Sequence, residues 1–464
     1  MPPTRQTDTS VAIVGGGISG LSAAYELQRR EVPHLLFERT SRLGGVIRTD
    51  IERGFTIDGG PDSLLVQKPA AIQLCHELGL GSRLVPTGTP RTAYVLRDSQ
   101  LFPLAEGSVL GIPLGSLATT GLLSMAGKAR MALELTTPPA AADEDESIGS
   151  FFRRRFGSEA VDYIAEPLLA GIHAGDVEKL SMHALFPRLV DAERRHGSVI
   201  KGLRSLKAAT PPNPDGLFRS LPGGLGELTD ALVGVLDGDT LKPGQDVVGL
   251  DVSGVVTLTL AGGDTVTADH VILATPAPAT ALLLGPVDTE LTALCSGIPY
   301  TSTATVVLDY PRDRVTHALD GTGFVVPRIE REYSLMAGSW VSSKWPGRAP
   351  DGHALVRGFV GGARDDAALD HTDEELISDV DRDFRALLGI SAEPELRKVY
   401  RWPRLNPQHE VGHLDRLAAI DKRLAAFPCV HITGAGFRGV GIPDCIANGR
   451  ATAATVADQL GSTL

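Results

Sequence analysis

Apolar runs near the N-terminus flank a segment with helical periodicity. Val11 to Val14 form one short apolar run and Leu35 to Phe37 form a second. Between them, apolar residues recur at the spacing of one helix face, at Leu21, Ala24, Tyr25 and Leu27. The pattern predicts strand, helix and strand at the length of a βαβ unit. It therefore indicates an α/β fold with a parallel sheet.

Further along the chain, the pattern predicts hairpins, buried strands and additional helices. Two hairpins are expected where alternating or apolar segments flank a polar turn, at residues 97–100 and 261–264. Buried strands are expected at residues 270–274, 303–308, 355–360 and 430–434. Helices are expected at residues 148–170, 373–388 and 446–460.

The order of these elements predicts several domains, because 464 residues exceed what one core usually organises. We expect a discontinuous Rossmann-like domain in three parts, at residues 1–90, 211–295 and 401–464. A mostly helical subdomain is expected at residues 91–210, and an α+β substrate domain at 296–400. The Pro- and Gly-rich loop at residues 210–216 marks the return to the first domain.

Charge and cysteine content exclude several function classes. The formal net charge of -12 argues against a nucleic-acid partner, because phosphate binding needs concentrated Lys and Arg. The four cysteines lie far apart and form no C-x-x-C pair, which predicts neither a disulfide framework nor a zinc site. We see no cluster with metal-ligand spacing, so no metal is expected. The polar N-terminus has no pattern of a secretory signal, which favours a cytoplasmic protein.

The least charged stretch runs from Ser108 to Gly127. Pro113 and several glycines interrupt it, and its apolar density is too low for a membrane-spanning helix. Two interpretations are open: peripheral contact of the helical subdomain with the cytoplasmic face of a membrane, or an ordinary buried helical region.

A glycine fingerprint follows the first strand. Gly15, Gly17 and Gly20 form G-x-G-x-x-G at the start of the predicted helix. The three glycines allow a tight turn, close approach of a pyrophosphate and close packing of helix on strand. Glu38 ends the second strand, where a carboxylate can bind ribose hydroxyls. Together these residues predict a dinucleotide-binding site.

Further glycine pairs favour FAD over NAD. Gly44-Gly45 and Gly59-Gly60 follow the ribose-binding position, where a nicotinamide domain needs neither pair. A Gly-rich loop from Gly434 to Gly449 opens the last helix, so backbone amides and the helix dipole can reach a flavin ring. Val440, Gly441 and Ile442 are expected against the ring, while Asp444 caps the helix or contacts the ribityl chain.

Several blocks resemble the oxygen-dependent protoporphyrinogen and coproporphyrinogen oxidases, a family within the amine-oxidase-like flavoproteins. The most specific block is EPLLAGIHAGDVEKLSMHALFP, at residues 166–187. The other blocks are LGGVIR at residues 43–48, GPDS at 60–63, PGGLGEL at 222–228, YRWP at 400–403, QHEVGHL at 408–414 and GVGIPDCI at 439–446.

The resemblance implies an FAD site made of residues from distant segments. The residues expected to contact FAD are Gly15, Gly16, Gly17, Ile18, Ser19, Gly20, Glu38, Arg39, Arg42, Gly45, Val46, Gly60, Pro61, Asp62, Ser63, Val247, Trp402, Gly434, Val440, Gly441 and Ile442. Trp402 also fits a packed core aromatic.

The resemblance also implies a porphyrinogen substrate, whose macrocycle needs a mostly aliphatic pocket with cations at the rim. Expected wall residues are Gly171, Phe324, Val326 and Met336. Ala93 stands where plant and animal protoporphyrinogen oxidases carry a propionate-binding arginine, and Arg91 lies two positions away. The identity of the propionate-binding cation, and of the porphyrinogen, is therefore open.

The implied reaction is the six-electron oxidation of protoporphyrinogen IX to protoporphyrin IX, with coproporphyrinogen III oxidation as the alternative. Hydride passes from a bridge carbon to flavin N5, and dioxygen reoxidises the flavin to give hydrogen peroxide. No catalytic side chain is required, so the histidines at 173, 409 and 413 are not assigned as bases. More distant alternatives are an amine oxidase, a carotenoid desaturase and a binding protein that has lost its flavin. Homodimer formation is left open.

Overall fold

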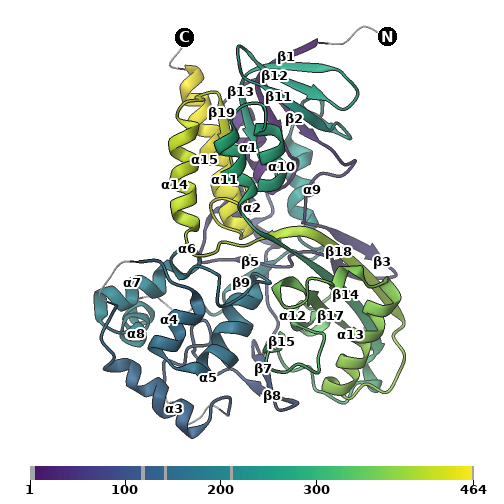
Figure 1. Cartoon of the computed structure of the whole chain (residues 1–464). Helices are drawn as coiled ribbons and strands as arrows, with labels where there is room; N and C mark the ends of the chain where they lie inside the picture. Colours follow the sequence, from purple (N-terminus) through teal and green to yellow (C-terminus); the bar gives the residue numbers. More distant parts are fainter. Residues whose placement is uncertain (1–5, 116–120, 141–143, 210–212, 462–464) are drawn as a thin grey trace.

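The computed structural model describes residues 6–115, 121–140, 144–209 and 213–461. Figure 1 shows one domain, which contains both ends of the chain, above two lower lobes. The first lower lobe is helical, and the second is built on a separate sheet. The mixed α/β fold expected from the sequence is confirmed.

The upper domain is built on a seven-stranded sheet of order β10-β2-β1-β13-β12-β11, with β19 also paired to β13. β1 is parallel to both β2 and β13. The strands are β1 (Gln6–Val14), β2 (His34–Glu38), β10 (Leu241–Pro243), β11 (Val247–Asp251), β12 (Val256–Leu260), β13 (Thr265–Leu273) and β19 (Val430–Ile432). Three distant parts of the chain therefore build one sheet. β12 and β13 form the hairpin predicted around residues 261–264.

Helices cover both faces of this sheet. One face packs against α1 (Ile18–Arg29), α2 (Ala70–Glu77), α9 (Gly226–Val235) and α15 (Ile442–Gly461). The other face packs against α10 (Ala277–Leu284), α11 (Thr289–Ser296) and α14 (His413–Leu424). The last helix begins at residue 442, four residues before the expected start at 446.

The second lobe contains a seven-stranded sheet of order β18-β14-β17-β16-β15-β7-β8. Its strands are β7 (Ala93–Arg97), β8 (Gln100–Pro103), β14 (Tyr300–Pro311), β15 (Gly323–Val325), β16 (Ala337–Trp340), β17 (His353–Gly361) and β18 (Leu396–Pro407). α13 (Asp373–Leu388) packs on one face of this sheet and confirms the helix predicted at these residues. The short α12 (Val341–Lys344) follows β16.

The two ends of this sheet differ from the expected domain boundaries. The predicted hairpin around residues 97–100 is β7 and β8, and β7 pairs in parallel with β15. Residues 93–103 therefore belong to the second sheet and not to the helical subdomain. β18 likewise continues to Pro407, past the expected boundary at residue 400. Long-range strand pairing decides both boundaries, and local sequence does not encode it.

Small sheets connect the lobes. They consist of β3 (Thr49–Glu52) with β4 (Phe55–Asp58), and of β9 (Phe218–Ser220) between β5 (Leu64–Leu65) and β6 (Val85–Pro86). The expected crossing loop at 210–216 is only partly covered, since residues 210–212 lie outside the described ranges.

The helical lobe has its own apolar core. Its helices are α3 (Met125–Ala132), α4 (Ile148–Arg155), α5 (Ser158–Ala160), a π-helix (Val161–Ala170), α6 (Met182–Leu185), α7 (Pro187–His196) and α8 (Val199–Ala209). Within the described ranges, no helix combines the length and the apolar character needed to span a membrane.

The weakly charged stretch at 108–127 contributes to this core. Residues 116–120 lie outside the described part of the chain, but Ile112, Leu114, Leu122 and Leu123 are all buried in the core cluster of the helical lobe. Of the two interpretations of this stretch, these four side chains favour the buried region.

Candidate functional site

The turn between β1 and α1 depends on the absence of two side chains. Gly15 has φ +109°, and a Cβ atom there would lie 2.7 Å from the Ala274 carbonyl oxygen. A Cβ atom on Gly20 would lie 1.9 Å from the Gly15 oxygen. These two glycines therefore allow the turn and the close packing of α1 that the fingerprint predicts.

Gly17 differs, because a Cβ atom there would meet nothing within 4 Å. This glycine caps α1, and no side chain accepts a hydrogen bond from the first amides of the helix. The next residues, Ile18 and Ser19, are buried against the core. The helix N-terminus thus faces free space, which the side chain of any other residue at position 17 would fill. This space fits the pyrophosphate of a dinucleotide. The backbone around Gly17 therefore fits FAD.

Glu38 lies beside this turn. Its Oε2 accepts a hydrogen bond from the Gly16 amide at 2.8 Å, and its Oε1 accepts from the Thr40 amide at 2.9 Å. The two bonds fix the carboxylate at the end of β2, where a ribose would lie. The neighbouring Arg39 is exposed.

A second loop approaches the turn from residues 42–47. A Cβ atom on Gly45 would lie 3.1 Å from the Gly17 Cα, and the Gly44 amide donates to the Gly16 carbonyl at 2.8 Å. The Arg42 guanidinium donates to carbonyl oxygens of this same loop, at Leu43, Gly45 and Ile47. Arg42 therefore shapes the loop around the cofactor site. Val46 remains 38% exposed at its tip.

The expected cofactor segment at 60–63 is held by buried charges of the second lobe. Asp62 is buried, and its Oδ2 lies 2.9 Å from the Lys344 Nζ, 2.8 Å from an Arg357 nitrogen and 3.1 Å from the Trp345 Nε1. Burial would raise the pKa of Asp62, but the charges of Lys344 and Arg357 outweigh it and hold that pKa far below its usual range. The Asp62 side chain therefore takes part in a network of buried charges from the second lobe.

The adjacent glycine pair packs against aromatic residues. A Cβ atom on Gly60 would lie 2.0 Å from the Val46 carbonyl oxygen, and the Trp402 Nε1 donates to the Gly59 carbonyl at 3.1 Å. Pro61 and Ser63 flank this contact and are half-buried. Trp402 thus lies beside the 59–60 backbone, and the segment connects the loop at Val46 to the second sheet.

The C-terminal glycine loop is held by two histidines of the QHEVGHL block. The Nε2–H of His409 donates to the Ala435 carbonyl at 3.1 Å, and the Nε2–H of His413 donates to the Phe437 carbonyl at 2.9 Å. Because a carbonyl can only accept, both rings carry their proton on Nε2. Burial, with the neighbouring ring of His413, lowers the pKa of His409 to about 3, and burial lowers that of His413. Both rings are therefore neutral structural donors.

The residues expected against the flavin ring follow this loop. Gly434 has φ +116°, Val440 is half-buried, Gly441 is exposed and Ile442 is buried at the start of α15. Asp444 accepts a hydrogen bond from the Lys68 Nζ at 2.6 Å, so it forms an ion pair from the first turn of the helix. Val247, an expected FAD contact, is buried on β11 next to a register shift.

The family block at 166–187 places the 171–175 segment against the QHEVGHL block. The Gln408 Nε2 donates to the His173 carbonyl at 2.9 Å, and a Cβ atom on Gly175 would lie 2.5 Å from the Gln408 Oε1. A Cβ atom on Gly171, an expected wall residue, would have its nearest neighbour 3.7 Å away, at the Glu166 carbonyl oxygen. Burial and the charge of Lys68 lower the pKa of His173 to about 4, so this ring is neutral.

Two expected wall residues are in a core. Phe324 and Val326 are 3% and 2% exposed, and both belong to the cluster between the second sheet and α13. Side chains alternate along a strand, so Val325 lies on the opposite face and packs against the helical lobe. Phe324 and Val326, which were expected to line the substrate pocket, therefore have their side chains in the core of the second lobe. Met336 is half-buried, and its amide donates to the Phe359 carbonyl at 2.8 Å.

Sequence reasoning missed Phe359 on this same face. Phe359 is opposite Thr305 and Ala337, and Ala337 is opposite Val325. The Arg357 guanidinium lies 4.9 Å from the Phe359 ring centroid and donates to the Gly60 carbonyl at 3.0 Å. Phe359 is thus a half-buried aromatic on the sheet face that meets the cofactor segment. Alternation along the strand at 355–360 was the signal that could have found it.

At the expected propionate-binding position, the guanidinium of Arg91 is bonded to the protein itself. Ala93 is half-buried at the start of β7, and the Arg91 guanidinium donates to the carbonyls of Thr87 at 3.3 Å and Pro214 at 2.9 Å. Two other cations flank the 171–175 segment with half-exposed side chains: Lys68 at 47% and Arg328 at 48%. Lys68 is paired with Asp444 at 2.6 Å, whereas the Arg328 guanidinium lies 4.0 Å from Asp176.

Comparisons with known proteins agree with this geometry. The family model of flavin-containing amine oxidoreductases matches residues 18–457. The chain is 39% identical over 458 residues to the coproporphyrinogen III oxidase of Bacillus subtilis, covering 95% of this chain and 96% of that protein. Protoporphyrinogen oxidase 2 of Arabidopsis thaliana is 26% identical over 486 residues, covering 97% and 94%. A crystal structure of a provisionally named protoporphyrinogen oxidase from Exiguobacterium sp. 255-15 superposes with a TM-score of 0.87 at 32% identity, covering 98% and 100% of the two chains.

Proposed function

We propose that this protein, which belongs to the porphyrinogen oxidase group of flavin-containing amine oxidoreductases, oxidises coproporphyrinogen III to coproporphyrin III. It uses FAD. The sequence placed protoporphyrinogen IX first and coproporphyrinogen III second. The comparisons support coproporphyrinogen III, because the relative named for coproporphyrinogen is 39% identical and the plant relative named for protoporphyrinogen is 26% identical.

The observation that carries this proposal is the match over nearly the whole chain to the Bacillus subtilis relative, together with the glycine turn open at Gly17. Coproporphyrinogen carries four propionate arms, whereas protoporphyrinogen carries two and has two vinyl groups. A site for coproporphyrinogen therefore needs more cations at its rim. Lys68 and Arg328 are half-exposed beside the 171–175 segment and fit that need.

The chain's own residues have binding and positioning roles in this reaction. Bound FAD supplies the two-electron acceptor, and dioxygen regenerates it. His409 and His413 hold the loop before α15, while Asp62 and Arg357 hold the segment at 58–62. Phe359 offers an apolar surface on the adjoining sheet face. His173, His409 and His413 have lowered pKa values through burial, which makes them poor proton acceptors.

The test is a competition between substrates. Each porphyrinogen is prepared anaerobically and offered to the purified protein in air, and porphyrin fluorescence is followed. We expect kcat/KM to be at least about tenfold higher for coproporphyrinogen III, a difference of about 1.4 kcal/mol in transition-state binding. Equal values would contradict the preference for coproporphyrinogen III, reversed values would favour protoporphyrinogen IX, and no oxidation of either would reject the proposed reaction. A flavin spectrum of the same sample establishes that the cofactor is present.

A further inference from the structure

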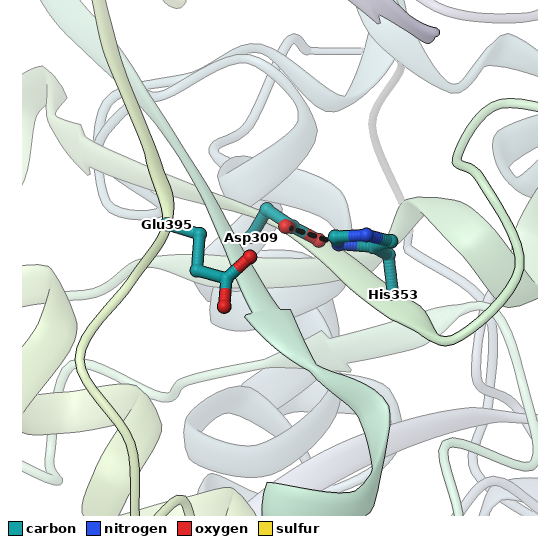
Figure 2. A group of neighbouring side chains, drawn as sticks. All are labelled: Asp309, His353 and Glu395. Carbon is teal, nitrogen blue, oxygen red and sulfur yellow. Dashed lines mark hydrogen bonds and ion pairs between the residues drawn. The ribbon is translucent and has the colours of Figure 1, made fainter. Parts of the chain in front are cut away.

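Three potential metal ligands meet at one end of the second sheet (Figure 2). Asp309 lies on β14, His353 begins β17, and Glu395 directly precedes β18. Asp309 lies six residues along β14 from Thr303, the residue opposite Trp402. Strand geometry therefore separates this cluster from the Trp402 position by about 20 Å. The cluster takes no part in the proposed oxidation.

The three side chains approach one another closely. The Asp309 Oδ2 lies 2.7 Å from the His353 Nδ1, and one ligand atom from each residue lies within 4.8 Å of the others. Figure 2 shows the Asp309 carboxylate between the Glu395 carboxylate and the His353 ring. The Glu395 amide also donates to the Asp309 carbonyl at 2.8 Å, which fixes the backbone at this point.

One polar atom in the cluster lacks a protein partner. The Asp309 side chain is 0% exposed, and its Oδ1 has no hydrogen-bond partner among the described residues. Buried carboxylate oxygens normally have a donor or a cation beside them. A bound cation would satisfy this oxygen.

We propose that Asp309, His353 and Glu395 bind a divalent transition-metal ion of the Zn²⁺ class. An imidazole with two carboxylates suits Zn²⁺, whereas Ca²⁺ and Mg²⁺ prefer oxygen ligands throughout. Ligand atoms of a Zn²⁺ ion lie about 3.0–3.5 Å apart, given bonds of about 2.0–2.2 Å. The exposed Glu395 side chain can close the remaining gap. The ion connects two neighbouring strands to the segment before a third, so it stabilises the sheet and does not take part in catalysis.

No sequence motif predicts this site, because its residues are separated by 44 and 42 positions along the chain. The arrangement exists only once β14, β17 and β18 have paired. The competing explanation is an ion pair between Asp309 and His353, with Glu395 free.

The test uses the purified flavoprotein after EDTA treatment and dialysis. Zn²⁺ is titrated by calorimetry, and thermal unfolding is measured with and without it. We expect one saturable site and a higher Tm with Zn²⁺, but not with Mg²⁺. Both effects should be lost in His353→Gln and weakened at least about tenfold in Glu395→Gln, whose exposed position makes misfolding a poor explanation.

His371→Gln is the matched control, because His371 forms a similar half-exposed pair with Asp379 at 3.8 Å without a third ligand. This variant should retain the site. The absence of a saturable site in the parent protein, or the same binding in His353→Gln, would overturn the proposal in favour of the simple ion pair. The rate of porphyrin formation should be unchanged by EDTA, so failure of the metal site leaves the proposed oxidation untouched.

Discussion

The rings of His409 and His413 stack at 3.9 Å between centroids, with their planes inclined by 10°. Each ring donates an N–H hydrogen bond to a backbone carbonyl of the loop that precedes α15. A proton added to either ring places a positive charge against the other, in a buried site. The arrangement therefore depends on both rings being neutral, and a specific acid sensitivity follows.

We expect the free energy of unfolding to fall as the pH drops from about 6.5 toward 4. The pKa of His409 is lowered in the folded protein, to about 3, so the unfolded chain binds protons that the folded chain does not. The contribution of each such histidine to the free energy of unfolding is fully present above the ordinary histidine pKa. Below that pKa it falls by about 1.4 kcal/mol per pH unit. His173 and Asp145 lie near the pair, and Arg416 adds a positive charge beside His413.

The measurement is urea unfolding at several pH values, with flavin absorbance recorded at each. His409→Gln is the informative variant, because its amide can still donate to the Ala435 carbonyl but does not titrate. Its stability should depend less steeply on pH than that of the parent protein. Equal slopes would show that other groups cause the acid sensitivity.

Replacement by alanine should have different effects at Gly17 and at Gly20, on flavin content at the first and on stability at the second. A Cβ atom at Gly17 meets no protein atom within 4 Å, so Gly17→Ala should fold but crowd the pyrophosphate. We expect a near-normal urea midpoint for the apoprotein and a flavin content reduced at least about tenfold. Gly20→Ala should instead lower stability, because its Cβ atom would lie 1.9 Å from the Gly15 oxygen.

Gly234→Ala is the control for this comparison. Gly234 lies in α9, a Cβ atom there meets nothing within 4 Å, and alanine favours helix by about 1 kcal/mol. This variant should keep both its fold and its flavin. A yellow Gly17→Ala protein with unchanged flavin content would remove the assignment of the turn to the pyrophosphate.

The glycine turn could be predicted because its geometry is local. Gly15, Gly17 and Gly20 lie within six residues; Gly15 and Gly20 have no room for a side chain, and Gly17 leaves space open beside the start of α1. The contacts of Asp62 could not be predicted, because Lys344 and Arg357 follow it by 282 and 295 positions. The family resemblance implies an FAD contact for Asp62, and the structure shows that its side chain pairs with these two cations.

Asp62→Asn should lower stability markedly. The change removes the negative charge that Lys344 and Arg357 share and leaves two cations in a buried site. Breaking such a pair costs about 3–5 kcal/mol. Urea unfolding measures this loss. Glu393→Gln, at an exposed pair with Arg385, should cost less than about 1 kcal/mol, and similar losses in the two variants would contradict the network.

The strand at Phe324 shows a second limit of sequence reasoning. Residues 323–327 read Gly-Phe-Val-Val-Pro, so apolar side chains occupy both faces and their pattern does not identify the buried one. Pairing with β16 and β7 decides the face, and it directs Phe324 toward α13. Fold class and cofactor were thus accessible from local patterns, whereas the substrate face required the sheet register.

Phe359→Ala and Phe324→Ala should therefore separate substrate binding from stability. Phe324→Ala empties part of a core and should cost about 3–5 kcal/mol in unfolding free energy. Phe359→Ala removes a half-buried ring and should lower kcat/KM for the porphyrinogen about tenfold or more, with a smaller effect on unfolding. Steady-state kinetics and urea unfolding on both variants test this. An unchanged kcat/KM in Phe359→Ala would exclude that ring from the substrate surface.

Arg328 gives the most direct test of the propionate rim. Its backbone amide donates to Glu166 at 2.8 Å, but its guanidinium is weakly held, 3.5 Å from the Ala363 carbonyl and 4.0 Å from Asp176. Arg328→Ala keeps the backbone bond and removes the charged side chain. We expect KM for coproporphyrinogen III to rise about tenfold, which corresponds to about 1.4 kcal/mol, with kcat within about twofold and an unchanged flavin spectrum.

The control is Arg331→Ala, an exposed arginine three positions along the same loop. It changes the net charge equally, so both variants share any long-range effect on an anionic substrate. The KM of Arg331→Ala should stay near that of the parent protein. An exposed charge pairing with a carboxylate is screened by salt, so the difference between the two variants should shrink as ionic strength rises. Equal KM values for both variants at low salt would remove Arg328 from the rim and leave Lys68 as the candidate cation.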